Sequence, residues 1–104
     1  MSTNGGSSYD TGSNYSWQAF VMQSAVTGTN GNDSDTAIYL TNDITNAQTY
    51  QSLSGKVNLF APRSGVLYKQ LVGQTVGPYS GRAANITAWS VAGIYKNATA
   101  VNAF

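Results

Sequence analysis

The chain has 104 residues, a net charge of +1 and a charged fraction of 9%, against about 25% in an average globular domain. This length fits one domain with a modest core, and the near-zero charge argues against nucleic acid as a partner. The sequence has no Cys, His or Glu, which excludes disulfides, thiolate metal sites and the usual catalytic bases. We therefore expect neither enzymatic activity nor a cofactor.

Ser, Thr, Asn and Gly together supply 44 of the 104 residues. A surface of hydroxyl and amide groups is common in β-rich extracellular and virion proteins, whose turns consume Gly and Asn. No apolar run approaches the roughly 20 residues that a membrane helix needs, and the N-terminal residues are polar, so we expect no membrane insertion and no signal peptide. The acidic residues all precede residue 44 and the basic residues all follow residue 55, too widely spaced to form a basic patch.

The first part of the chain predicts a leader followed by short strands. Residues 1–15 are rich in Gly, Ser, Thr and Asn, so we expect them to form a flexible leader. Residues 16–22 (SWQAFVM) predict the first strand. Residues 28–35 (GTNGNDSD) predict a turn, because Asn-Gly tolerates positive φ, and residues 36–41 (TAIYLT) predict a short β-branched and aromatic strand.

The middle of the chain alternates between polar and strand-like segments. Residues 42–54 are polar and predict irregular structure. Residues 55–60 (GKVNLF) alternate cleanly and predict a strand that ends before Pro62, since proline cannot donate to a ladder. Residues 66–72 (VLYKQLV) predict a further strand, and residues 73–84 predict a long loop with glycine and proline.

The last part of the chain is the most regular. Residues 85–95 alternate and predict a strand with Trp89 on its buried face. Residues 98–104 predict a second apolar piece, anchored by Val101 and Phe104. Because termini are normally polar surface segments, an end on Phe104 predicts a chain that stops within a strand.

Six or so predicted strands, with no convincing helical periodicity, predict a single all-β domain over residues 16–104. We expect an antiparallel β-sandwich of the jelly-roll type, incomplete in itself and finished by a partner chain. Trp89 is expected in its core, packed against the strands at 16–22 and 55–60.

The segment at 28–35 holds the candidates for chemistry. Asp33 and Asp35 lie two residues apart, so an extended chain can bring both carboxylates to one face, although two solvated turn residues are the alternative. Asn30, Asn32, Asp33 and Asp35 can also offer oxygen ligands to a calcium ion. Their spacing does not match an EF-hand and no Glu completes the shell, so the pattern favours an ordinary turn without a metal.

Aromatic residues make up 12% of the chain. Tyrosine and tryptophan on a polar β surface serve in sugar-binding sites and protein interfaces, whereas the largest aromatic residues also build the core of a small domain. Tyrosines in or near polar segments and the two C-terminal anchors are the candidates for contact with a partner or a glycan: Tyr9, Tyr50, Tyr68, Tyr79, Val101 and Phe104.

Several motifs resemble a family of phage structural β-sandwich domains found in tail, fibre and other virion proteins. They are GKVNLFAP at 55–62, LYK at 67–69 and GIYKNATAVNAF at 93–104. STNGGSSYDTGSNYSW and NGNDSDTAIYL, within residues 2–40, look like the middle of the same domain. The resemblance covers most of the chain but only the interior of the family's domain. It implies further strands beyond both ends, no active site and no cofactor.

Two hypotheses about function therefore remain open. The first is a non-enzymatic structural or host-adhesion domain of a virion, an extracellular particle, that packs with copies of itself or with other virion proteins and contacts host-surface glycans. The alternative is a free carbohydrate-binding module that uses exposed tyrosines. A third and weaker hypothesis is a hydrolase that uses Asp33 or Asp35, and this one carboxylate pair is its only support.

Overall fold

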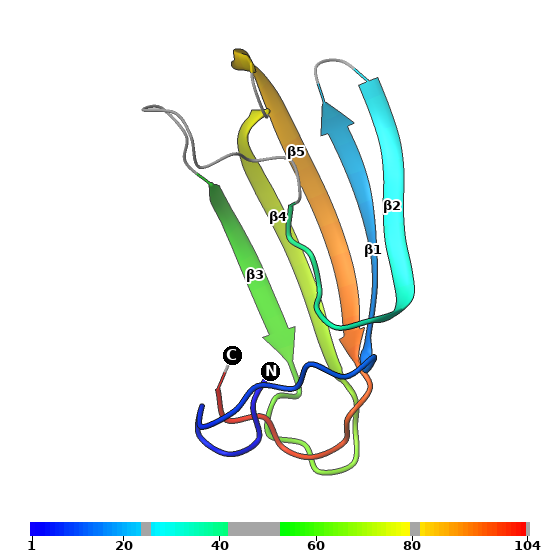
Figure 1. Ribbon diagram of the computed structural model, residues 1–104, viewed down its shortest axis with the longest axis vertical. Coiled ribbons are helices and arrows are strands. Elements are labelled where there is room, and N and C mark those ends of the chain that lie inside the picture. The colour runs from blue at the N-terminus through cyan, green and yellow to red at the C-terminus, as the bar shows by residue number, and fades with distance from the viewer. Residues whose placement is uncertain (24–25, 42–52, 80–81, 104) are drawn as a thin grey trace.

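A computed structural model describes residues 1–23, 26–41, 53–79 and 82–103. These residues form an all-β structure, as predicted, in which five antiparallel strands make one sheet (Figure 1). The strands are β1 (Tyr15–Gln23), β2 (Val26–Asp35), β3 (Ser54–Phe60), β4 (Lys69–Tyr79) and β5 (Arg82–Tyr95). Their order across the sheet is β2-β1-β5-β4-β3, so β5 is central and β2 and β3 are the edges.

The sheet has two unlike faces because side chains alternate along each strand. In β5, Trp89, Val91 and Tyr95 are buried on one face, whereas Ser90 and Ile94 are exposed on the other. This is the alternation that the sequence predicts for residues 85–95. β1 alternates in the same way, and its pairing with β5 brings the buried positions of the two strands side by side.

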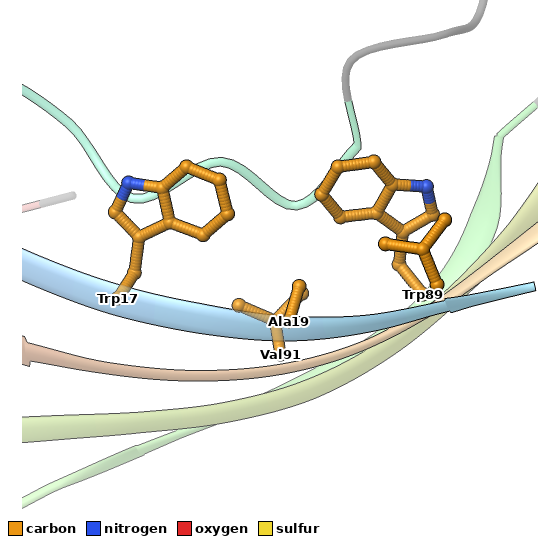
Figure 2. Close-up of a cluster of buried hydrophobic side chains, with 5 residues drawn as sticks. Trp17, Ala19, Trp89 and Val91 are labelled. Carbon is orange, nitrogen blue, oxygen red and sulfur yellow. The ribbon is translucent and has the colours of Figure 1, made fainter. Parts of the chain in front are cut away.

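We call the buried side of the sheet the covered face, because residues 36–41 cross it (Figure 1). Ile38 packs into the space above Gly93, where an added Cβ atom would lie only 2.7 Å from the Ile38 Cδ1 atom. Beneath this segment lies one apolar cluster, with the two tryptophans standing on the same side of the sheet (Figure 2). Its buried members are Trp17, Ala19, Val21, Trp89 and Val91.

Residues 36–41 are held on the covered face by their neighbours in the sheet. The Tyr39 ring lies 5.4 Å from the Trp17 ring, centroid to centroid. The Thr75 hydroxyl donates a 2.6 Å hydrogen bond to the Leu40 carbonyl. The strand predicted at 36–41 is therefore wrong: this segment belongs to no strand and serves as the cover of the core.

A second cluster closes the end of the sheet where both chain termini lie (Figure 1). Tyr15 and Tyr95 stack with ring centroids 4.9 Å apart, and Val101 is buried against them. Residues 1–14, expected to form a flexible leader, reach this end as well. Ser2 is buried there, and its amide donates a 2.8 Å hydrogen bond to the carbonyl of Ala103.

The turn predicted at 28–35 is wrong, since these residues form most of β2. They pair with β1 in a register that runs from Gln23 opposite Val26 to Tyr15 opposite Asp35. The side chains of this edge strand are mostly exposed, so small polar residues are tolerated and pairing outweighs turn propensity. Gly31 also permits a close approach, because a Cβ atom there would lie 2.7 Å from the Trp17 carbonyl oxygen.

The loop predicted at 73–84 is also wrong where the structure describes it. β4 continues through these residues as far as Tyr79, and β5 begins at Arg82. Hydrogen bonding to β3 on one side and β5 on the other compensates for the weak strand propensity of glycine. Pro78 stands opposite Ile86, directly before the register becomes irregular, a position that proline tolerates.

The sandwich expected from the sequence requires two sheets, and the described residues form one. Trp89 is buried, as predicted, and β1 packs beside it. Its expected contact with residues 55–60 is wrong because β4 lies between β5 and β3. The strand expected at 55–60 is confirmed as β3. Most of the irregular segment predicted at 42–54 lies outside the described residues.

Candidate interaction surface

We call the other side of the sheet the open face, because its side chains remain exposed within the described part of the chain. Seven large apolar side chains from four neighbouring strands stand on it, each between 40% and 62% exposed. They are Phe20 and Met22 of β1, Ile86 and Ile94 of β5, Val72 and Val76 of β4, and Phe60 of β3. Exposed apolar side chains gathered on one face mark an interaction surface.

The pairing register arranges the open face in rows that cross the strands. Counted from the edge at β2 to the edge at β3, four rows mix apolar and polar residues. They are Thr27–Met22–Ala88–Val76–Ser54, Thr29–Phe20–Ser90–Gln74–Lys56, Gly31–Gln18–Ala92–Val72–Asn58 and, starting at β1, Ser16–Ile94–Gln70–Phe60. Lys56 is the only charged residue in these rows, and Asp33 of β2 lines the hollows beside them. Charge therefore lies at the two edge strands, and the strands between them offer amides and hydrocarbon.

Small residues in these rows leave the open face hollowed. The largest hollow has a volume of about 870 Å³ and lies beside Phe20, over Gly31 and Ala92. Two smaller hollows of about 380 and 360 Å³ flank it toward Ile94 and Met22 respectively. An uneven apolar surface of this kind accepts side chains from a partner.

Sequence reasoning missed the open face, although a signal for it exists. Phe20-Val21-Met22 is a run of three apolar residues in a strand, so apolar side chains must point to both faces. A strand that is apolar on both faces predicts a layer on each side of the sheet. The interpretation of residues 16–22 as an ordinary half-buried strand overlooked this.

The calcium candidates do not converge on one site. Asn30 and Asn32 lie on β2, and their side-chain oxygens accept hydrogen bonds from the amides of Gly31 and Ser34. Among the described residues, no group of three or more His, Cys, Asp or Glu side chains could hold a metal ion. Extended geometry explains this result, because a strand spreads these ligands along its length.

The two aspartates expected as a pair are engaged separately. The Asp35 carboxylate accepts hydrogen bonds from Trp17 Nε1 at 3.0 Å and from the Thr36 amide at 2.7 Å. The bond from Trp17, followed by that from Thr36, lowers the pKa of Asp35 from its ordinary value. Asp33 instead lines the hollows of the open face, and its carbonyl accepts bonds from Ser16 and Lys96. This arrangement shows no shared carboxylate site.

The contact tyrosines are placed in different segments. Tyr9 and Tyr68 are both about half exposed, the first in the N-terminal segment and the second in the loop before β4. Tyr50 lies outside the described residues, and so does the side chain of Tyr79, whose backbone belongs to β4. No aromatic platform built from these tyrosines is visible in the described part of the chain.

The C-terminal anchors also differ from the expectation. Val101 is 3% exposed, because it packs on Tyr15 and Tyr95 of its own chain and its amide bonds to the Pro62 carbonyl at 2.7 Å. It is therefore part of the interior and not a contact residue. Phe104 lies outside the described residues.

Asp10 links the N-terminal segment to the second cluster. The Tyr95 hydroxyl donates a 2.7 Å hydrogen bond to Asp10 Oδ2, and the Gly12 amide donates to Oδ1 at 2.8 Å. These bonds lower the pKa of Asp10, with Tyr95 as the largest cause. Burial, reinforced by the bond to Asp10, raises the pKa of Tyr95 to about 12. Both groups thus serve a structural role at the closed end of the sheet.

Comparison of the chain with protein-family models, curated proteins and solved structures found no match. Nor do the described residues contain a helix long and apolar enough to cross a membrane. The functional argument therefore depends on the geometry of the sheet, and the resemblance to phage β-sandwich domains remains an expectation.

Proposed function

We propose that this chain is a non-enzymatic structural and adhesion domain of a phage-type virion, which acts by packing the open face of its sheet against a second copy. The observation that carries the proposal is the contrast between the two faces. One face holds a packed core, whereas the other leaves seven large apolar side chains 40–62% exposed. A β-sheet buries such side chains by packing on a second layer, and a second copy would supply that layer.

The size of the open face suits a stable dimer. Strands in a sheet lie about 4.8 Å apart, and residues on one face repeat every ~6.8 Å along a strand. Five strands and four rows therefore span on the order of 600 Å² before the relief of the side chains adds to the area. Specific interfaces bury about 800 Å² per partner, so two open faces in contact approach that size.

The charge of the open face also favours a second copy. Like surfaces repel when they carry a net charge, but here the two charged residues are of opposite sign and lie on the edges, Lys56 on β3 and Asp33 on β2. The Lys56 ammonium can remain at the rim of an interface, in contact with water. The glutamines at Gln18, Gln70 and Gln74 can pair with amides of the same kind, since each offers both a donor and an acceptor.

Sedimentation of the purified chain tests this proposal. We expect the parent chain to form dimers or larger assemblies at micromolar concentration. Val72→Lys, which places a charge in the middle of the open face, should weaken association at least tenfold. Val26→Lys is the matched control, because Val26 is more exposed at 68% but lies at the end of β2, outside these rows.

Three results would overturn the proposal. The first is a folded parent chain that stays monomeric up to high micromolar concentration. The second is an assembly that Val72→Lys leaves unchanged, which would place the contact elsewhere. The third is specific binding of the isolated chain to a glycan array that is lost on replacing Tyr9 and Tyr68, which would favour the carbohydrate-binding module instead.

A further inference from the structure

Lys69 is fully buried at the start of β4, with 0% of its surface exposed. Its three Nζ–H donors are shared among four backbone carbonyls that lie between 2.7 and 3.2 Å from Nζ. The acceptors are the carbonyl oxygens of Ser64, Leu67, Asn97 and Ala98. An isolated buried charge is strongly unfavourable, so these four dipoles must replace the water that the ammonium has lost.

The four carbonyls come from two segments that are far apart in the sequence. Ser64 and Leu67 belong to the loop between β3 and β4, whereas Asn97 and Ala98 follow β5. The Lys69 ammonium therefore ties these segments together, a task that a bound metal ion performs in many loops. Because all four acceptors are neutral carbonyls, the cage matches a monovalent cation better than calcium, which prefers carboxylate ligands.

We infer that these four carbonyls form a site for a monovalent cation, which the tethered ammonium of Lys69 fills, and that its occupancy sets the shape of the loop at 61–68. The inference is independent of the proposed function because it concerns residues outside the open face.

The loop at 61–68 carries exposed apolar side chains whose position depends on this cation site. Val66, Leu67 and Tyr68 are exposed by 84%, 60% and 54%, three consecutive apolar side chains held away from the core. Ser64 Oγ accepts hydrogen bonds from the amides of Val66 and Leu67, at 3.2 and 2.9 Å, and so fixes the inside of the loop. The contacts of Lys69 Nζ with the four carbonyls hold the ends of the loop. Together with the bonds to Ser64 Oγ, they fix the conformation of residues 66–68.

The test removes the tethered cation and supplies a free one. We expect Lys69→Ala to lower the Tm by about 10 °C or more in sodium chloride, because four carbonyls lose the cation that they share. Ammonium or potassium chloride at the same ionic strength should recover about half of that loss. The amide chemical shifts of Val66 and Leu67 should return toward their parent positions at the same time.

A control and a further variant keep the outcome decisive. The parent chain is the control for general salt effects: Lys69 already occupies its carbonyl cage, so the Tm of the parent should be the same in sodium, potassium and ammonium chloride. Lys69→Met keeps the side-chain length without the charge, and we expect it to be destabilised and insensitive to the cation. The inference is overturned if Lys69→Met is as stable as the parent. It also fails if Lys69→Ala responds equally to sodium, potassium and ammonium, or stays unfolded in all three.

Discussion

Replacing Trp89 by alanine tests whether the covered face is the core of the molecule. Trp89 is 3% exposed, and a buried tryptophan removes about 150–250 Å² from water, which at about 25 cal/mol per Å² corresponds to roughly 4–6 kcal/mol. Its Nε1 also donates a 3.0 Å hydrogen bond to the buried hydroxyl of Thr87, which would lose its donor. Alanine keeps part of this burial, so we expect Trp89→Ala to lower the free energy of unfolding by about 3–5 kcal/mol. A domain of this length has about 5–15 kcal/mol in total.

Urea denaturation, followed by tryptophan fluorescence at nanomolar concentration, where the chain is expected to be monomeric, measures this change. Phe20→Ala is the matched control. Phe20 lies opposite Ser90, the residue after Trp89, but its side chain stands on the open face and is 51% exposed. We expect this control to cost about 1 kcal/mol or less in the monomer. If Trp89→Ala unfolds within 1 kcal/mol of the parent, the covered face is not the core. Equal losses in both variants would instead mean that a second layer already buries the open face.

Two further predictions concern Tyr95 and Gly93. The pKa of Tyr95 is raised to about 12, against an ordinary value of 10.0. Between pH 10 and 12 the folded chain therefore keeps the Tyr95 proton that the unfolded chain releases, and the free energy of unfolding should fall across this range. Tyr95→Phe should make this alkaline decline shallower by up to about 1.4 kcal/mol per pH unit, measured by urea denaturation across that range; an unchanged slope would contradict it. Gly93→Ala should cost about 1–3 kcal/mol, because its Cβ would lie 2.7 Å from Ile38, and the cost should largely disappear in an Ile38→Ala background. Equal costs in both backgrounds would show that Ile38 does not cover Gly93.

The strands with a strong alternation could be predicted from the sequence alone. β1, β3 and the second half of β5 place large apolar side chains at every second position, and the pattern itself identifies the buried face. Trp89 and Tyr95 could therefore be assigned to the interior without any knowledge of their partners. The low charge and the absence of His, Cys and Glu are likewise read directly from the composition.

The open face was much harder to predict, because its exposure depends on whether a remote segment of the chain packs over that side of the sheet. Phe20 and Met22 are apolar, and a sequence cannot say whether a second layer will reach them. Within the described part of the chain, residues 36–41 cross one face of the sheet and no segment crosses the other. The calcium candidates failed for a related reason: a Gly- and Asn-rich segment reads as a turn until a neighbouring strand pairs with it.

Pairing and long-range contacts were decided only by the tertiary structure. β2 is a strand because β1 offers it a full ladder of backbone partners, although its own residues have little strand propensity. Lys69 is buried because carbonyls of the loop just before it meet those of Asn97 and Ala98 at its ammonium, and no residue near Lys69 in the sequence predicts the second pair. Side-chain alternation is a local property of the chain, so the sequence by itself determines it. The partner of a backbone amide or of a buried charge is set by where remote segments come to lie, which only the folded chain decides.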